Sequence, residues 1–273
     1  MSILLTWPFP LRFLTFLLVL VLGWLPIAAL LWLSIPPARD YVWIPLYAWL
    51  LILLWQWGSR VWRYERPFIS YGLTGDPLFR QELGLGLLLG VVGLFLLFGL
   101  QGWLGWLEWQ PIEGMTLILT LGVGLVLGLG VALVEELVFR GWLLNELRQD
   151  YGLWRGAFIS ALIFAIAHFL KPLPQTIESW PQFPGLWIMG WLLVEARQER
   201  GDRLSLGMGL HAGWIWGITL VNTLGWVEYT QRVPAWVTGV GGNPLAGILG
   251  VLFLLLTSQG LKMLPNRLWP AGE

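Results

Sequence analysis

The sequence predicts an all-α fold, a polytopic membrane bundle of about eight transmembrane helices. Three observations carry this prediction. Apolar residues make up 57% of the 273 residues and charged residues only 12%, about half of the charged fraction of a soluble domain. The apolar residues form runs close to the length that crosses a bilayer. Many of the 21 tryptophans stand at the ends of these runs, where an indole ring favours the headgroup level.

Eight apolar runs are interpreted as membrane spans, because a helix rises about 1.5 Å per residue and the hydrocarbon layer is about 30 Å thick. The fifth and sixth are short, so we expect them to be buried in the bundle, tilted or partly re-entrant. The runs cover approximately residues 13–35, 41–57, 83–103, 115–138, 156–170, 184–197, 206–226 and 244–261.

The basic residues test this map, because cytoplasmic loops of membrane proteins carry an excess of arginine and lysine. With both termini in the cytoplasm, twelve basic residues fall inside, three fall outside, and Arg140 lies at the boundary. The inner set is Arg12, Arg60, Arg63, Arg66, Arg80, Arg148, Arg155, Arg197, Arg200, Arg203, Lys262 and Arg267; the outer set is Arg39, Lys171 and Arg232. We therefore predict an integral, multi-pass protein of a plasma, bacterial inner or thylakoid membrane, with cytoplasmic termini.

The chain divides into two predicted parts. Residues 1–82 hold two spans and a basic cytoplasmic loop, and residues 83–273 form the transmembrane core. Small residues let membrane helices approach closely, and the core carries two glycine series, Gly84, Gly86, Gly90 and Gly93, then Gly122, Gly124, Gly128 and Gly130. A charged segment between the sixth and seventh spans is interpreted as a solvated turn; it contains Glu195, Arg197, Glu199, Arg200, Asp202 and Arg203.

The composition excludes several classes of function. The chain has no cysteine, which rules out disulfides, thiolate catalysis and Cys-ligated zinc. Sixteen basic and sixteen acidic residues cancel, so the net charge indicates no nucleic-acid partner. The partners we expect are membrane lipid and a protein or peptide.

Charges inside apolar spans are costly, so each one needs a reason. The fourth span carries no charge until Glu135 and Glu136, and Arg140 follows one turn later. Glu136 and Arg140 lie on one helix face and can pair, whereas Glu135 points about 100° away and is free for another role. A charged cap at the water interface is the alternative, although a helix C-terminus favours cations over acids.

Both histidines of the chain, His168 and His211, lie in apolar spans. Taken singly, each is equally well explained as a histidine bonded to a backbone carbonyl of a neighbouring helix. Together with Glu135 they form the minimum set for activating a water, with a carboxylate as base and an imidazole as proton shuttle. A second imidazole can stabilise an oxyanion.

The order Glu135-Glu136-Arg140, then Phe164 and His168, then His211 resembles the CPBP family of intramembrane glutamic proteases. That family contains the type II CAAX prenyl endopeptidases and proteins of bacteriocin processing or immunity. The resemblance covers roughly residues 110–260 and makes residues 83–273 a CAAX-protease-like catalytic core.

The resemblance implies that Glu135 and His168 activate a water that attacks a peptide carbonyl. The charge map predicts that this site lies near the cytoplasmic face. The resemblance also implies that Glu136, Arg140 and Phe164 support the site and that His211 holds the oxyanion. The family has an asparagine four residues after this histidine, where this chain has Ile215. Isoleucine cannot donate a hydrogen bond, and losing one oxyanion donor typically costs about 10²–10³ in rate. Asn222 lies about 16 Å from His211 along a helix axis and is a poor substitute.

The resemblance points to a mechanism without metal, so no cofactor is expected. Zinc, and with it metalloendopeptidase activity, stays as an alternative, because Glu135, Glu136, His168 and His211 are all groups that can ligate zinc. Two other functions also stay open. Ile215 favours an inactive membrane scaffold, immunity or assembly factor on the same fold, and intramembrane acids and histidines also build proton-coupled transporters. The sequence does not show whether the substrate is lipidated.

Overall fold

The computed structural model describes residues 3–34, 43–112 and 114–264. These residues form helices and one short two-stranded sheet, so the predicted all-α fold class is confirmed. Arg39 and Arg267 of the charge map lie outside the described residues. The elements are η1 (Ile3–Thr6), α1 (Phe9–Ser34), α2 (Trp43–Arg60), α3 (Pro67–Ser70), α4 (Pro77–Trp103), β1 (Leu107–Trp109), α5 (Gly114–Glu135), η3 (Glu136–Leu143), α6 (Leu144–Ala167), α7 (Leu173–Ser179), η4 (Trp180–Gln182), α8 (Phe183–Glu199), α9 (Ser205–Thr223), β2 (Val227–Tyr229), α10 (Ala235–Thr238), η5 (Pro244–Ala246) and α11 (Ile248–Met263).

Every predicted span overlaps a long helix, but the number of helices differs from eight. The short helices α7 and α10 were not predicted. By length and composition, three described helical stretches can cross a membrane, namely Phe9–Leu33, Pro77–Trp103 and Gly114–Ala167. The last stretch contains the predicted span 115–138 and most of the predicted span 156–170, because the polar residues between these two spans are also helical.

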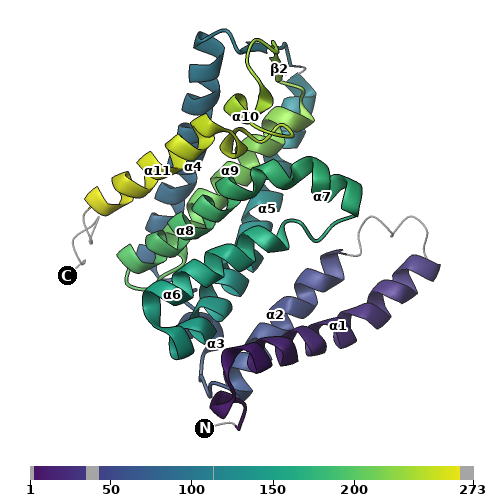
Figure 1. Cartoon of the computed structure of the whole chain (residues 1–273), viewed down its shortest axis with the longest axis vertical. Helices are drawn as coiled ribbons and strands as arrows, with labels where there is room; N and C mark the ends of the chain where they lie inside the picture. The colour runs from purple at the N-terminus through teal and green to yellow at the C-terminus, as the bar shows by residue number, and fades with distance from the viewer. Residues whose placement is uncertain (1–2, 35–42, 113, 265–273) are drawn as a thin grey trace.

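The run from α5 through η3 to α6 is broken at Gly152, which has φ 73° and ψ −179°. Only glycine adopts a positive φ without steric cost, so the helix can reverse there. An unbroken helix would separate Glu135 from His168 by about 50 Å. The break instead returns the end of α6 to the end of α5, as the ribbon shows (Figure 1).

Helix α9 occupies the middle of the bundle, between α4 and α5. Gly86 and Gly90 of α4 face Gly209 and Gly213 of α9, and a Cβ added at any of the four would press against backbone of the opposite helix. On the other side of α9, Gly128 of α5 packs in the same way. The predicted close approach through glycine is therefore confirmed at these positions, and it buries the middle of α9. A Cβ added at Gly84, Gly122 or Gly130 would meet no atom of another described element within 4 Å.

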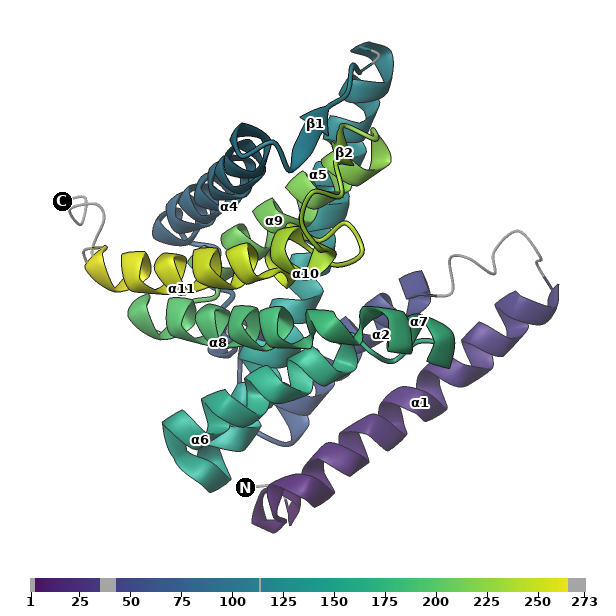
Figure 2. The ribbon, with the colours of Figure 1, turned by 45° about the horizontal axis from the view of Figure 1, so that its top comes forward.

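Helices α6, α8 and α11 stack side by side across the bundle, as the rotated view shows (Figure 2). Helices α1 and α2 form a separate pair on one flank. Strands β1 and β2 pair antiparallel, with Glu108 opposite Glu228. This two-stranded sheet ties the end of α4 to the segment that follows α9.

The interpretation of the 195–203 segment as a solvated turn is wrong for several of its members. Arg197, Arg200 and Glu195 are buried. Arg197 donates to the backbone carbonyl of Arg140 and to Asn145. Ser258 donates to Glu195 at 2.5 Å. A charge pattern along the sequence cannot show that α6 and α11 pack over this end of α8 and supply partners for these groups.

Candidate active site

Glu135 is the last residue of α5, and Glu136 begins the π-helix η3. A π-helix widens the turn by one residue, is rare, and occurs often at functional sites. The two carboxylates consequently face different surroundings. The side chain of Glu135 keeps 19% of its surface exposed, whereas that of Glu136 keeps 1%.

Glu136 is held by two partners. Its Oε1 accepts from Nη1 of Arg140 at 2.9 Å and lies 2.9 Å from Nδ1 of His211. The pairing of Glu136 with Arg140 is the one that the i, i+4 spacing predicts, but the contact with His211 was not anticipated. Because a carboxylate only accepts, Nδ1 of His211 carries the proton of this bond. Nε2 of His211 therefore points away from Glu136.

Arg140 is completely buried and anchors this network. Its Nη2 donates to the carbonyl of Gly190 on α8 at 3.2 Å. Its guanidinium carbon stands 4.1 Å from the centre of the Phe164 ring, an attractive cation–π arrangement. Phe164 in turn packs edge-on against His168, with ring centres 4.5 Å apart.

His168 caps the C-terminal end of α6. Its Nδ1 lies 2.8 Å from the carbonyl oxygen of Phe164, one of the carbonyls that a helix end leaves unpaired. A carbonyl only accepts, so Nδ1 is the donor and the neutral ring has a free lone pair on Nε2. The helix end thus fixes both the orientation and the tautomer of His168.

The two imidazoles converge on Glu135. Its Oε2 lies 4.0 Å from Nε2 of His168 and 3.7 Å from Nε2 of His211. In the described part of the chain this oxygen has no hydrogen-bond partner. Buried carboxylate oxygens are normally hydrogen-bonded, so an unpartnered one calls for an explanation. Three helices far apart in the sequence therefore present one carboxylate and two ring nitrogens to one another.

These three residues line one cavity of about 240 Å³. Its wall is mostly apolar, and Ile215 is part of it. The sequence analysis missed two amide side chains in the wall, Gln182 and Asn243. No motif marks Gln182, and Asn243 stands in a Gly-Gly-Asn-Pro run that indicates only a turn. The full lining is Val131, Glu135, His168, Gln182, Leu186, Met189, His211, Trp214, Ile215, Ile218, Asn243 and Leu245.

Asn222 does not line this cavity. Its Nδ2 instead lies 3.4 Å from the carbonyl oxygen of Gly242. Among the described residues, no group of three or more histidine or acidic side chains has the geometry to hold a metal ion. The cofactor expectation itself stays a prediction.

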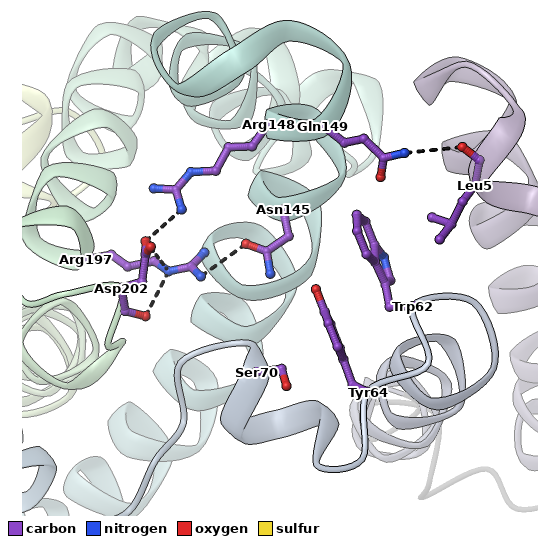
Figure 3. Close-up of a pocket in the computed structure, with 9 residues that line it drawn as sticks. All are labelled: Leu5, Trp62, Tyr64, Ser70, Asn145, Arg148, Gln149, Arg197 and Asp202. Atoms are coloured by element: carbon purple, nitrogen blue, oxygen red, sulfur yellow. Dashed lines mark hydrogen bonds and ion pairs between the residues drawn. The ribbon is translucent and has the colours of Figure 1, made fainter. Parts of the chain in front are cut away.

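A second cavity, of about 700 Å³, lies where α6 and α8 meet the loop after α2 (Figure 3). Its charged groups pair with one another, since Arg148 donates to the Asp202 carboxylate at 2.7 Å and Nε of Arg197 lies 3.5 Å from the same carboxylate. It contains no histidine. The first cavity is therefore the better candidate for acid–base chemistry.

Residues 117–217 match the family model of the type II CAAX prenyl endopeptidases, Rce1-like. The match is shorter than the resemblance inferred from the motifs, but it contains all six site residues and ends before Asn243. It confirms the resemblance to the CPBP family. No curated protein and no solved structure matches the chain. Together with the long apolar helices, the match supports an integral membrane protein.

Proposed function

We propose that this protein, whose residues 117–217 are Rce1-like, is an intramembrane endopeptidase that hydrolyses a peptide bond with a water activated by Glu135 and His168. One observation carries the proposal. An unpartnered carboxylate oxygen and the Nε2 atoms of two histidines meet in a single cavity.

The distances suit a water rather than a direct contact. Separations of 4.0 and 3.7 Å are too long for hydrogen bonds between Glu135 and the histidines. One water can contact the carboxylate oxygen and a ring nitrogen at such a separation. Both side chains line the cavity and keep part of their surface exposed, 19% for Glu135 and 30% for His168.

The proton balance of the reaction follows from these roles. The Glu135 carboxylate takes one proton from the water while the oxygen of the water bonds to the peptide carbonyl carbon. The electron pair of the carbonyl moves to its oxygen, which becomes an oxyanion. When this intermediate collapses, the C–N bond breaks and the leaving nitrogen receives the proton, directly from Glu135 or through Nε2 of His168. Water is consumed, and a carboxylic acid and an amine are formed.

His211 serves the oxyanion in this scheme. In its protonated form the ring presents Nε2–H to the cavity, while Glu136 accepts from Nδ1 and stabilises the positive charge. Arg140 donates to the same carboxylate oxygen and fixes Glu136 in place. The acid–arginine pair is thus a support for His211, and Glu135 does the proton transfer.

The experiment uses the purified full chain in liposomes with internally quenched peptides, each supplied in a farnesylated and an unmodified form. We expect the parent to cleave at least one peptide. Glu135→Gln and His168→Ala should each lower kcat by about 10²–10⁴, the usual contribution of a general acid or base. Comparison of the paired peptides shows whether a lipid group is needed.

Cleavage by Glu135→Gln at the parental rate would overturn the protease mechanism. Ile215 favours the inactive scaffold as the second candidate, and the absence of cleavage in the parent and the variants alike would support it. Proton-coupled uptake into the same liposomes, lost in Glu135→Gln, would support a transporter.

A further inference from the structure

We propose that Asn243, on the loop before η5, donates an amide N–H to the oxyanion and acts as a catalytic residue beside His211. This inference rests on the proposed protease function. It concerns a residue beyond the family match, brought to the cavity by the segment that links α10 to α11.

An oxyanion needs preorganised N–H or O–H groups aimed at the place where its charge develops. Apart from His211, the cavity wall holds four side chains with an N–H group. His168 uses its Nδ1–H for the carbonyl of Phe164, and Gln182 donates to the carbonyl of Val240 at 3.1 Å. The indole N–H of Trp214 is buried and has no partner among the described residues, and Gln182 keeps a second amide hydrogen. Asn243 is the half-buried side chain whose two amide hydrogens both lack a partner in the described part of the chain.

The orientation of the Asn243 amide is fixed from one end. Its Oδ1 accepts from the backbone N–H of Leu245 at 3.0 Å, as the N-cap of η5. No acceptor for its NH₂ group is found among the described residues, and the side chain is only half-buried. The amide therefore offers its NH₂ to the cavity without competition from the protein.

The loop that carries Asn243 is tied down by three amide side chains, each from a different element. Gln101 of α4 donates to the carbonyl of Thr238 at 3.0 Å, Gln182 of η4 to that of Val240 at 3.1 Å, and Asn222 of α9 to that of Gly242 at 3.4 Å. The backbone of Asn243 itself donates to Val240. A donor held this way needs little reorganisation when charge develops, which is the condition for electrostatic catalysis.

The glycines of the loop let it turn back on itself. Gly239, Gly241 and Gly242 have φ values of 139°, 63° and 73°, which residues with a Cβ rarely adopt. This turn brings Asn243 to the cavity that His211 of α9 also lines. The two proposed oxyanion donors therefore come from different segments of the chain. No proton is transferred, since Asn243 only strengthens a hydrogen bond as the carbonyl oxygen becomes negative.

Two substitutions of Asn243 remove its proposed role as an oxyanion donor and keep its role as the N-cap of η5. Asn243→Asp and Asn243→Ser each keep an oxygen for the N–H of Leu245 and remove the amide NH₂. The first adds a charge and the second does not. The control is Asn222→Asp, which loosens the loop from outside the cavity. The readouts are kcat and KM for the peptide that the parent cleaves best, together with the thermal unfolding midpoint in the same detergent.

We expect kcat to fall by about 10²–10³ in both Asn243 variants, with KM and the unfolding midpoint close to those of the parent. Asn222→Asp should lose less than about tenfold in kcat. An Asn243→Ser protein within about threefold of the parental kcat would overturn the assignment. So would a fall in Asn222→Asp as large as in Asn243→Ser, because loop order and not the amide would then set the rate.

The Glu135→Gln protein distinguishes the two proposals. If it is inactive while Asn243→Ser cleaves like the parent, the protease function stands and the Asn243 assignment fails. If Glu135→Gln cleaves like the parent, the protease mechanism fails, and the assignment of Asn243 fails with it.

Discussion

Two carboxylates on the same helical run, Glu135 and Glu146, have opposite surroundings. Glu146 is fully buried, and every oxygen of its side chain has a donor: Arg12 Nε at 2.6 Å, Trp57 Nε1 at 2.7 Å and Trp62 Nε1 at 2.6 Å. Glu135 has an oxygen with no partner in the described part of the chain and faces two imidazoles across a cavity.

The different hydrogen bonding of Glu146 and Glu135 indicates different roles for the two carboxylates. A buried charge that is fully hydrogen-bonded holds elements together, and here Glu146 joins α1 and α2 to the start of α6. A buried polar atom left unpartnered costs free energy and gives nothing to the fold. Glu146 therefore serves the fold, whereas the unpartnered oxygen of Glu135 fits its proposed role of binding a water.

The largest expected effect is on stability. Glu146→Gln leaves the buried Arg12 with only the partly exposed Asp150 as a carboxylate partner, and breaking a buried pair typically costs about 3–5 kcal/mol. We expect a clearly lower thermal unfolding midpoint in detergent for this variant. Glu135→Gln, the matched substitution, should unfold at or above the parental temperature. Equal unfolding midpoints for the two variants would contradict the structural role assigned to Glu146.

The next effect is on the rate of cleavage. Glu136→Gln weakens the charged hydrogen bond to His211, a bond typically worth about 1.5–3 kcal/mol. We expect kcat to fall by about 10–100-fold, less than for Glu135→Gln, because His211 stays in place but loses the stabilisation of its protonated form. A loss in Glu136→Gln that exceeds the loss in Glu135→Gln would reverse the roles assigned to the two acids.

Helix packing gives a smaller effect. Gly86→Ala places a methyl group against the carbonyl oxygen of Leu206 on α9, whereas Gly84→Ala meets nothing within 4 Å. Overpacking of this kind costs about 1–3 kcal/mol. We expect a lower unfolding midpoint and weaker cleavage only for Gly86→Ala. Equal behaviour of the two alanine variants would show that the glycine contact between α4 and α9 does not position His211.

The smallest expected effect is that of chelators. Because the proposed steps use only Glu135, His168 and His211, preincubation with EDTA or 1,10-phenanthroline should leave kcat unchanged. A chelator-sensitive rate that added Zn²⁺ restores would instead favour the zinc alternative, in which the two histidines and Glu135 act as ligands.

The sequence by itself determined the membrane character, the helical class and the residues of interest. Acids and histidines are so costly in apolar spans that Glu135, His168 and His211 stand out without any alignment. The i, i+4 spacing was also enough to pair Glu136 with Arg140, because that contact is local.

Only the tertiary structure decided which of these groups meet and what completes the cavity. The bond from His211 to Glu136, the burial of Arg197 and the arrival of Asn243 from the loop before η5 all join residues far apart in the chain. Such contacts depend on how α4, α5, α8 and α9 pack and on the reversal at Gly152. Periodicity and composition report the face a residue occupies on its own helix, and they carry no information on which other helix lies opposite.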